Sequence, residues 1–152
     1  MIDCTFELNG KPMSIFKCGA TSFPAFSGLG KHVNKRISAC IPNQGPIPSG
    51  TYYIIDRQSG GLLGPLRDLF TDRDTWFALY AIDEKIDDET FCNNVKRGLF
   101  RLHPKGPFGR SEGCVVINKK SDFLFLRTIL KNTSKSLIPD TELESYGRLV
   151  VK

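Results

Sequence analysis

The pattern of apolar and polar positions along the chain predicts short strands separated by turns that are rich in glycine and proline. Residues 6–8 and 11–16 flank Asn9-Gly10, a dipeptide that readily adopts the positive φ angles of a two-residue hairpin turn. Residues 51–56 form an aromatic and β-branched run directly after the turn-rich segment 41–50, which is typical of a loop that opens a strand. The first third of the chain is therefore predicted to be β-structure.

The same pattern continues later in the chain. Residues 76–82 are apolar at positions of both alternating faces, which predicts a central strand covered on both sides. Residues 98–103 and 114–118 are two further predicted strands, joined by a polar, glycine-rich loop. Residues 147–151 are predicted to close the chain as a strand.

Helices are expected at two places only. Ser121 can N-cap a helix over 122–131, with Asp122 well placed against the helix dipole. A single helical turn is expected over 66–70, after the glycine-rich connection 58–65. The sequence thus predicts a mainly β fold, a small barrel or curved sandwich with one or two short helices.

The composition fits one globular domain over residues 1–152. The chain is 40% hydrophobic and 24% charged, and its 11 Phe, 4 Tyr and 1 Trp can supply a core. A domain of this length buries about 70% of the surface that its unfolded chain exposes, so neither metal nor disulfides are required for stability.

Charge and hydropathy narrow the range of partners. The 21 Lys and Arg exceed the 16 Asp and Glu, giving a formal charge of +5, but the basic residues are scattered. Nucleic-acid binding is therefore unsupported, whereas attraction to anionic cell-wall polymers is allowed. The longest apolar stretch, 123–130, is far shorter than the ~20 residues of a spanning helix, so no membrane insertion is predicted. Residues 1–10 lack the features of a Sec-type signal peptide, which predicts a protein made in the cytoplasm.

The cysteines and histidines do not form a metal-binding pattern. The five cysteines include no C-x-x-C pair, and only two histidines are present, so no zinc site and no cofactor is expected. Two disulfides with one free thiol are possible, as is a reduced set. A two-residue hairpin would place Cys18 three residues beyond the position opposite Cys4, which argues against a bridge between them. Core positions are expected for four cysteines: Cys4, Cys18, Cys40 and Cys92.

One segment, residues 103–114, gathers reactive side chains and glycines. It begins with His103 and ends with Ser111, Gly113 and Cys114. A neighbouring imidazole can take the proton of a thiol and make it a nucleophile at neutral pH. Because the two residues end and begin flanking strands, the intervening loop can bring them to one rim. The chemistry expected of such a pair is acyl transfer.

Strand alternation adds a prediction about orientation. Phe100 and Leu102 are expected in the core, which would turn Arg101 and His103 toward a groove. A tight turn at Gly113 would leave backbone N–H groups beside the sulfur for an oxyanion. The alternative is that Cys114, followed by an apolar run, is a buried core cysteine.

These residues resemble the active-site signature of the L,D-transpeptidases, bacterial enzymes that act on the tetrapeptide stems of peptidoglycan. The similar residues are His103, Gly106 and Ser111-Glu112-Gly113-Cys114, and a second match is the turn 45–52, which leads into a strand at Tyr52. The chain is most similar to a compact branch, the L,D-transpeptidase-like effectors of type VI secretion systems. Most of the wider family has His where this chain has Glu112, a difference that favours cleavage of the stem or exchange of its terminal D-amino acid over crosslinking.

The resemblance implies a role for several residues. Cys114 would be the nucleophile, His103 the general base and acid, and Ser111 a residue that shapes the catalytic loop. Gly113 and Cys114 would donate to the oxyanion. Among the partners it implies are peptidoglycan stem peptides, a type VI delivery component and a cognate immunity protein, with action in the periplasm of a target cell.

Other substrate contacts are suggested by side-chain chemistry. Arg101 and Arg110 could each clamp a stem-peptide carboxylate, or could be exposed surface charges. Gly106 and Tyr52 are further candidates for the substrate groove, although Tyr52 and Trp76 have the spacing of core residues.

Two other features are given an ordinary structural interpretation. His32 is expected to be solvated in a polar loop, and the acidic segment 83–89 is expected to be a solvated turn rather than a metal site.

Two rival functions remain open at this point. A papain-like Cys-His amidase places Cys before His, whereas here His103 precedes Cys114. The other rival is a non-catalytic wall-binding or polyanion-binding toxin module in which Cys114 is buried.

Overall fold

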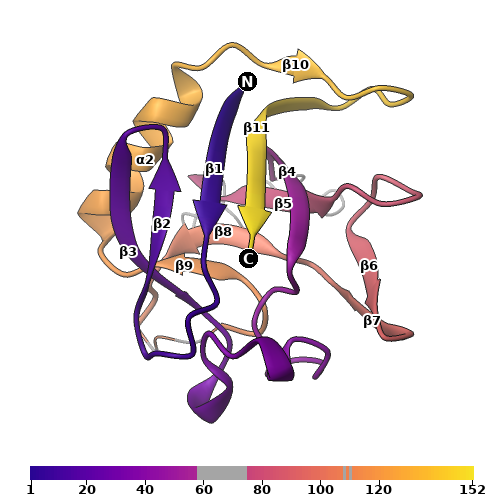
Figure 1. Ribbon diagram of the computed structural model, residues 1–152. Helices are drawn as coiled ribbons and strands as arrows, with labels where there is room; N and C mark the ends of the chain where they lie inside the picture. Colours follow the sequence, from indigo (N-terminus) through magenta and orange to yellow (C-terminus); the bar gives the residue numbers. More distant parts are fainter. Residues whose placement is uncertain (58–74, 108, 110) are drawn as a thin grey trace.

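The fold is a closed β-barrel with one α-helix packed against it, as seen in a computed structural model that describes residues 1–57, 75–107, 109 and 111–152 (Figure 1). Eight strands form the ring in the order β1-β2-β3-β9-β8-β5-β4-β11, and a parallel pairing of β11 with β1 closes it. The ring strands are β1 (Ile2–Phe6), β2 (Ser14–Cys18), β3 (Thr21–Ser27), β4 (Gly50–Asp56), β5 (Phe77–Ala81), β8 (Arg101–Pro104), β9 (Val115–Ile117) and β11 (Glu144–Val151). The predicted small, mainly β barrel is confirmed.

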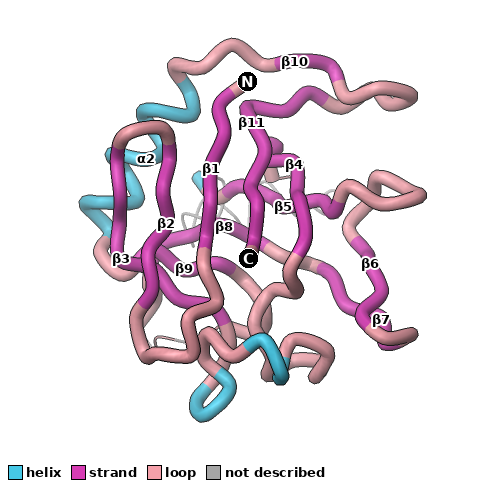
Figure 2. The backbone as a smooth tube through the Cα atoms, in the orientation of Figure 1, coloured by secondary structure: helices cyan, strands magenta, loops and turns pink. Residues whose placement is uncertain are grey.

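The remaining elements lie around this ring (Figure 2). Strand β10 (Ser136–Leu137) extends the sheet beyond β11, while β6 (Glu89–Cys92) and β7 (Val95–Gly98) form a separate hairpin. Two short 3-10 helices, η1 (Gly30–His32) and η2 (Arg36–Ser38), lie in the loop between β3 and β4. Closing the sheet on itself removes the exposed edges that an open sheet of this size would present.

Helix α2 (Lys120–Lys131) covers part of the barrel with one apolar stripe. Phe123, Leu126 and Leu130 are fully buried and recur at the spacing of one helical face. The helix contacts β8, β9 and β11, so it supports the two strands that carry His103 and Cys114. The prediction that Ser121 caps this helix is wrong: Ser121 is the second helical residue, and Lys119 occupies the N-cap position without a side-chain hydrogen bond.

Strand β5 is central, as its apolar pattern predicts. It lies between β4 and β8, with Phe77 and Leu79 in the main core and Ala78 in a smaller cluster on the other face. Both faces of the strand are therefore covered, which explains why its sequence does not alternate. The expected helical turn at 66–70 and the connection 58–65 lie outside the described residues.

The first hairpin has a different register from the one predicted. Phe6 pairs with Phe16, and Cys4 lies directly opposite Cys18. The predicted two-residue turn does not form because the Leu8 N–H donates to Lys152 O (2.8 Å) and thus joins the end of the chain instead of β2. The predicted register is therefore wrong, whereas the expectation that Cys4 and Cys18 are not bridged agrees with the structure, in which both are free thiols.

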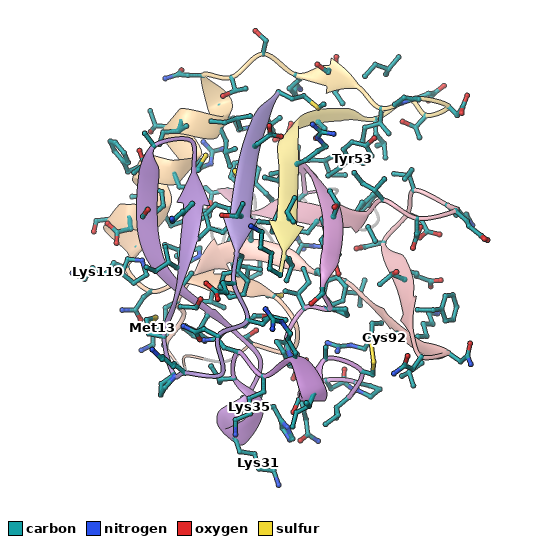
Figure 3. All side chains as sticks on the ribbon, in the orientation of Figure 1. Met13, Lys31, Lys35, Tyr53, Cys92 and Lys119 are labelled. Carbon is teal, nitrogen blue, oxygen red and sulfur yellow. A yellow bond between two sulfur atoms is a disulfide. The ribbon has the colours of Figure 1, made fainter. Side chains whose placement is uncertain are left out.

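A disulfide between Cys40 and Cys92 ties the loop after η2 to the β6–β7 hairpin (Figure 3). Both residues were expected to be core cysteines, and that expectation is corrected by this bond. Cys4 and Cys18 are buried as expected, and Cys114 is half-buried; these three are free thiols.

Among the described residues, no helix has the length and apolar character that a membrane span requires.

Candidate active site

The sheet register brings Cys114, the residue directly before β9, next to the strand that carries His103. Strands β8 and β9 are parallel neighbours, with Leu102 opposite Val115 and His103 opposite Val116. Strand alternation extended by one residue before β9 predicts that the Cys114 side chain lies on the same face as Val116 and His103.

The opposite face of these strands belongs to the core. Phe100, Leu102 and Val115 are all buried in the main hydrophobic cluster. This burial fixes the strands in register and so fixes which face His103 presents. His103 itself is only 7% exposed, so it is more enclosed than a side chain turned into an open groove.

Contacts with Pro104 and Trp76 help to orient the His103 ring. Its Nδ1 lies 2.8 Å from Pro104 O, and its ring stacks on Trp76 with 4.2 Å between centroids. A carbonyl oxygen can only accept, so Nδ1 carries the proton and Nε2 holds the lone pair in the neutral ring. The stacked Trp76 ring restrains the orientation of the imidazole. The arrangement is that of an imidazole prepared to act as a base through Nε2.

The surroundings of Cys114 favour the neutral thiol over the thiolate. Burial raises the pKa of Cys114, and the backbone hydrogen bond and positive charge of Arg101 oppose this rise only in part. The Sγ atom lies 4.0 Å from Leu99 O, which can accept its proton weakly. Cys114 is half-buried, unlike the fully buried cysteine of the non-catalytic alternative. A thiolate would therefore have to form by proton transfer during the reaction.

Ser111 holds the loop that precedes Cys114. Its side chain is 2% exposed, and its Oγ donates to Cys114 O (2.7 Å). The same oxygen accepts from the N–H of Gly28 (3.1 Å) and, at a longer distance, from that of Gly113 (3.4 Å). One hydroxyl thus connects β3 to both residues at the start of β9.

Gly113 occupies a position that no larger residue fits. Its φ of +122° lies in the region that favours glycine, and an added Cβ would lie 2.6 Å from an Arg97 nitrogen. The expected role of Gly113 as an oxyanion donor requires its N–H to leave Ser111 Oγ when substrate binds.

Arg97 is a buried cation beneath this loop. Its guanidinium is hydrogen-bonded to the carbonyl oxygens of Ala39, Gly45 (3.1 Å) and Glu112 (3.4 Å), and burial lowers the pKa of Arg97. The contacts join the disulfide-bearing loop to the residue two positions before Cys114. Sequence reasoning missed this role, because Arg97 follows Lys96 in a polar segment with no motif around it.

Arg101 does not have the role expected of it. Its guanidinium forms a bidentate salt bridge with Asp88 (2.8 and 2.6 Å), so both of its terminal nitrogens are already bound to a carboxylate of the same chain. It is also not an exposed charge, since the side chain is largely buried. Its position beside Cys114 makes it a source of positive potential at the thiol.

Tyr52 and Gly106, the other predicted substrate contacts, lie in different surroundings, and the role of Gly106 stays a prediction. Tyr52 is buried in the core, where its hydroxyl donates to Pro48 O (2.7 Å) and its ring meets Phe100 edge to face. Gly106 lies on the surface, in a turn in which the Gly109 N–H donates to Gly106 O (3.1 Å). Arg110 lies outside the described residues.

His32 is also not simply solvated. It is half-buried, and its Nδ1 lies 2.9 Å from Ser38 Oγ.

The acidic segment 83–89 is an exposed to half-buried turn that contains ion pairs. Asp87 pairs with Lys85 and Glu89 with Lys96. Within the described part of the chain, no group of three or more His, Cys, Asp or Glu residues could hold a metal ion.

A cavity of about 400 Å³ lies beside the loop that precedes Cys114, although neither Cys114 nor His103 lines it. Its lining includes Leu99, whose carbonyl contacts Cys114, and Glu112, which precedes Gly113. Asp88, Lys96 and Arg97 line it as well, so its wall carries charges of both signs. A peptide with free amino and carboxyl groups would find partners there.

The protein is thus a small closed β-barrel in which a loop held by Ser111 leads through Cys114 into the strand beside His103. Residues 21–141 match the family model of the Tlde1 domain, and the chain therefore belongs to that family. Tlde1-domain proteins are type VI secretion effectors and act as antibacterial toxins. Membership of this family implies delivery by a secretion system and a cognate immunity protein. No match was found among curated proteins or among solved structures.

Proposed function

We propose that this effector is a cysteine enzyme that removes or exchanges the terminal D-amino acid of peptidoglycan tetrapeptide stems. The observation that supports the proposal is that Cys114 directly precedes β9, the parallel neighbour of the strand that carries His103, and that Nδ1 of His103 faces Pro104 O. The family assignment supports an antibacterial effector, and the residues at this face supply the chemistry.

The reaction would begin with proton transfer from Cys114 Sγ to His103 Nε2. The thiolate then attacks the carbonyl carbon of the bond to the terminal D-amino acid, and the C–N bond breaks as His103 returns the proton to the leaving amine. The product is a thioester on Cys114. Water resolves it to a shortened stem, whereas the amine of a second D-amino acid resolves it by exchange.

The surroundings of the thiol favour this sequence. Arg101 stabilises negative charge at Cys114, while Asp88 holds the Arg101 guanidinium in place. The loop clamped by Ser111 and Arg97 would present the Cys114 N–H to the developing oxyanion. The stem would lie in the cavity bordered by Leu99 and Glu112.

The test is to incubate the purified protein with a defined tetrapeptide muropeptide, with and without a second D-amino acid, and to identify products by mass. We expect loss of the terminal residue, or its replacement when the second D-amino acid is present. A tetrapeptide that remains unchanged while bound to the protein would overturn the proposal in favour of a wall-binding module. A cleaved glycan or a different cleaved peptide bond would assign another reaction.

A further inference from the structure

Cys4 and Cys18 face each other across the first antiparallel hairpin. They are direct partners in the register of β1 and β2. One residue further out, the Gly19 N–H donates to Asp3 O (3.4 Å), which identifies Cys4 and Cys18 as a non-hydrogen-bonded pair. Such pairs have Cα atoms about 4.5 Å apart, within the range of about 4.4–6.8 Å that a disulfide spans.

The two thiols also point to the same place. Each residue is only 1% exposed and belongs to the main core cluster. The two thiols shift each other in opposite directions, so the pKa of Cys4 is raised and that of Cys18 is lowered, each chiefly by the other. Because both side chains belong to one cross-strand pair on the buried face of the sheet, the two sulfur atoms lie near each other in the core.

We propose that Cys4 and Cys18 are a latent second disulfide, formed when the chain meets a disulfide-donating oxidant, while Cys114 stays outside any bridge. The Cys40–Cys92 bond accounts for two of the five cysteines, and the new bond would account for two more. Cys114 is then the one thiol without a cysteine opposite it. The inference concerns the barrel and holds whatever reaction Cys114 performs.

The redox step balances with an organic disulfide such as oxidised glutathione. The Cys18 thiolate attacks one sulfur of the oxidant, releases one glutathione thiolate and becomes a mixed disulfide. The Cys4 sulfur, losing its proton, then attacks Cys18 Sγ and releases the second glutathione. The protein loses two electrons and two protons, and the oxidant becomes two thiols. Because both sulfurs are buried, the attack requires transient opening of the hairpin, or occurs while the chain folds.

The bond would fasten the start of the chain into the barrel. Strand β1 begins at Ile2 and joins β2 to β11, so it is the strand through which the ring closes. A covalent link from β1 to β2 would resist separation at that point.

The direct test is disulfide mapping after folding in a glutathione redox buffer. The oxidant is raised until the Cys40–Cys92 peptide appears, free thiols are alkylated, and the chain is digested without reduction. We expect a crosslinked Cys4–Cys18 peptide, lighter than the two reduced peptides by about 2 Da because two hydrogen atoms leave, and Cys114 in no crosslinked pair. Alkylated Cys4 and Cys18 beside a formed Cys40–Cys92 bond would overturn the proposal, as would a bridge from Cys114 to either of them.

A second measurement isolates the effect on stability. In the Cys40→Ala/Cys92→Ala variant, oxidation should raise the midpoint of thermal unfolding by roughly 5–10 °C, and reductant should reverse the rise. The matched variant with Cys4→Ala and Cys18→Ala added should show no such response. If the double variant fails to fold, the peptide map of the unaltered chain still decides the question.

Discussion

Replacing Ser111 with Ala should damage both stability and activity, because one buried hydroxyl holds the catalytic loop. The substitution removes the acceptor of the Gly28 N–H and the donor to Cys114 O, at 3.1 and 2.7 Å. The 3.4 Å bond from Gly113 is long and is expected to add little.

The magnitude follows from the groups left behind. A buried backbone group that loses its hydrogen bond costs about 1–3 kcal/mol. One N–H and one carbonyl are affected, and partial relaxation of the loop lowers the total, so we expect the free energy of unfolding to fall by about 2–3 kcal/mol. With a urea m-value of about 2 kcal/mol/M, the unfolding midpoint should move down by roughly 1–1.5 M.

The assay is equilibrium urea unfolding, paired with kcat/KM on the tetrapeptide stem. Displacement of Cys114 by about 1 Å should reduce kcat/KM by roughly 100-fold in the fraction that stays folded. Ser121→Ala is the control, because Ser121 is exposed on α2 and its loss should change stability by less than about 0.5 kcal/mol. A Ser111→Ala protein as stable and as active as this control would refute the clamp.

Three further predictions follow from the site and the barrel. His103→Gln should raise the apparent pKa of Cys114 and slow its alkylation near neutral pH, because the imidazolium that stabilises the thiolate is lost. An alkylation rate with the same pH dependence as in the unaltered protein would show that His103 is not the partner of Cys114. Burial opposes ionisation of Asp56, but hydrogen bonds from Lys131 and Tyr146 outweigh it and lower the pKa of Asp56. Asp56→Asn should therefore be less stable than the unaltered protein at pH 7, and the difference should shrink as the pH falls below about 4, through the lowered pKa; a difference that persists in acid would contradict this origin. Expression in a Gram-negative host should be harmless in the cytosol and toxic with a cleavable signal peptide, and Cys114→Ala should remove the toxicity; growth curves would show the reverse if the target were cytosolic.

The parts of the fold that rest on local pattern could be predicted from the sequence. The all-apolar run at 76–82 predicted a central strand, and β5 has neighbours on both sides and cover on both faces. Alternation predicted that Phe100 and Leu102 enter the core, and both are buried. Each of these predictions depends on the spacing of apolar residues along a strand, which does not change with the tertiary contacts around it.

Features set by distant contacts could not be predicted in this way. The register of the first hairpin depends on the bond from Leu8 to Lys152, at the far end of the chain. The Cys40–Cys92 pairing joins segments 52 residues apart, and spacing alone leaves such pairings open. Arg97 is held by hydrogen bonds to backbone carbonyl groups of two separate loops, and backbone contacts of this kind leave no pattern of side chains in the sequence.

The same distinction between local pattern and distant contacts applies to the candidate site. Local sequence brought attention to His103, Ser111 and Cys114, while the roles suggested for Arg101 and Tyr52 rested on side-chain type alone. Asp88 engages the first and Pro48 the second, and neither partner is a sequence neighbour close enough for alternation to reveal it.

The central claim is that Cys114 forms the acyl-enzyme, and turnover of the tetrapeptide stem by Cys114→Ala tests it most directly. The side chain is half-buried and small, so the variant should keep the thermal midpoint of the unaltered protein within a few degrees. We predict that it loses at least about 1,000-fold in turnover, while Cys18→Ala, which removes a free thiol on another strand, remains active. A folded Cys114→Ala protein that keeps about a tenth or more of the original turnover would contradict the account.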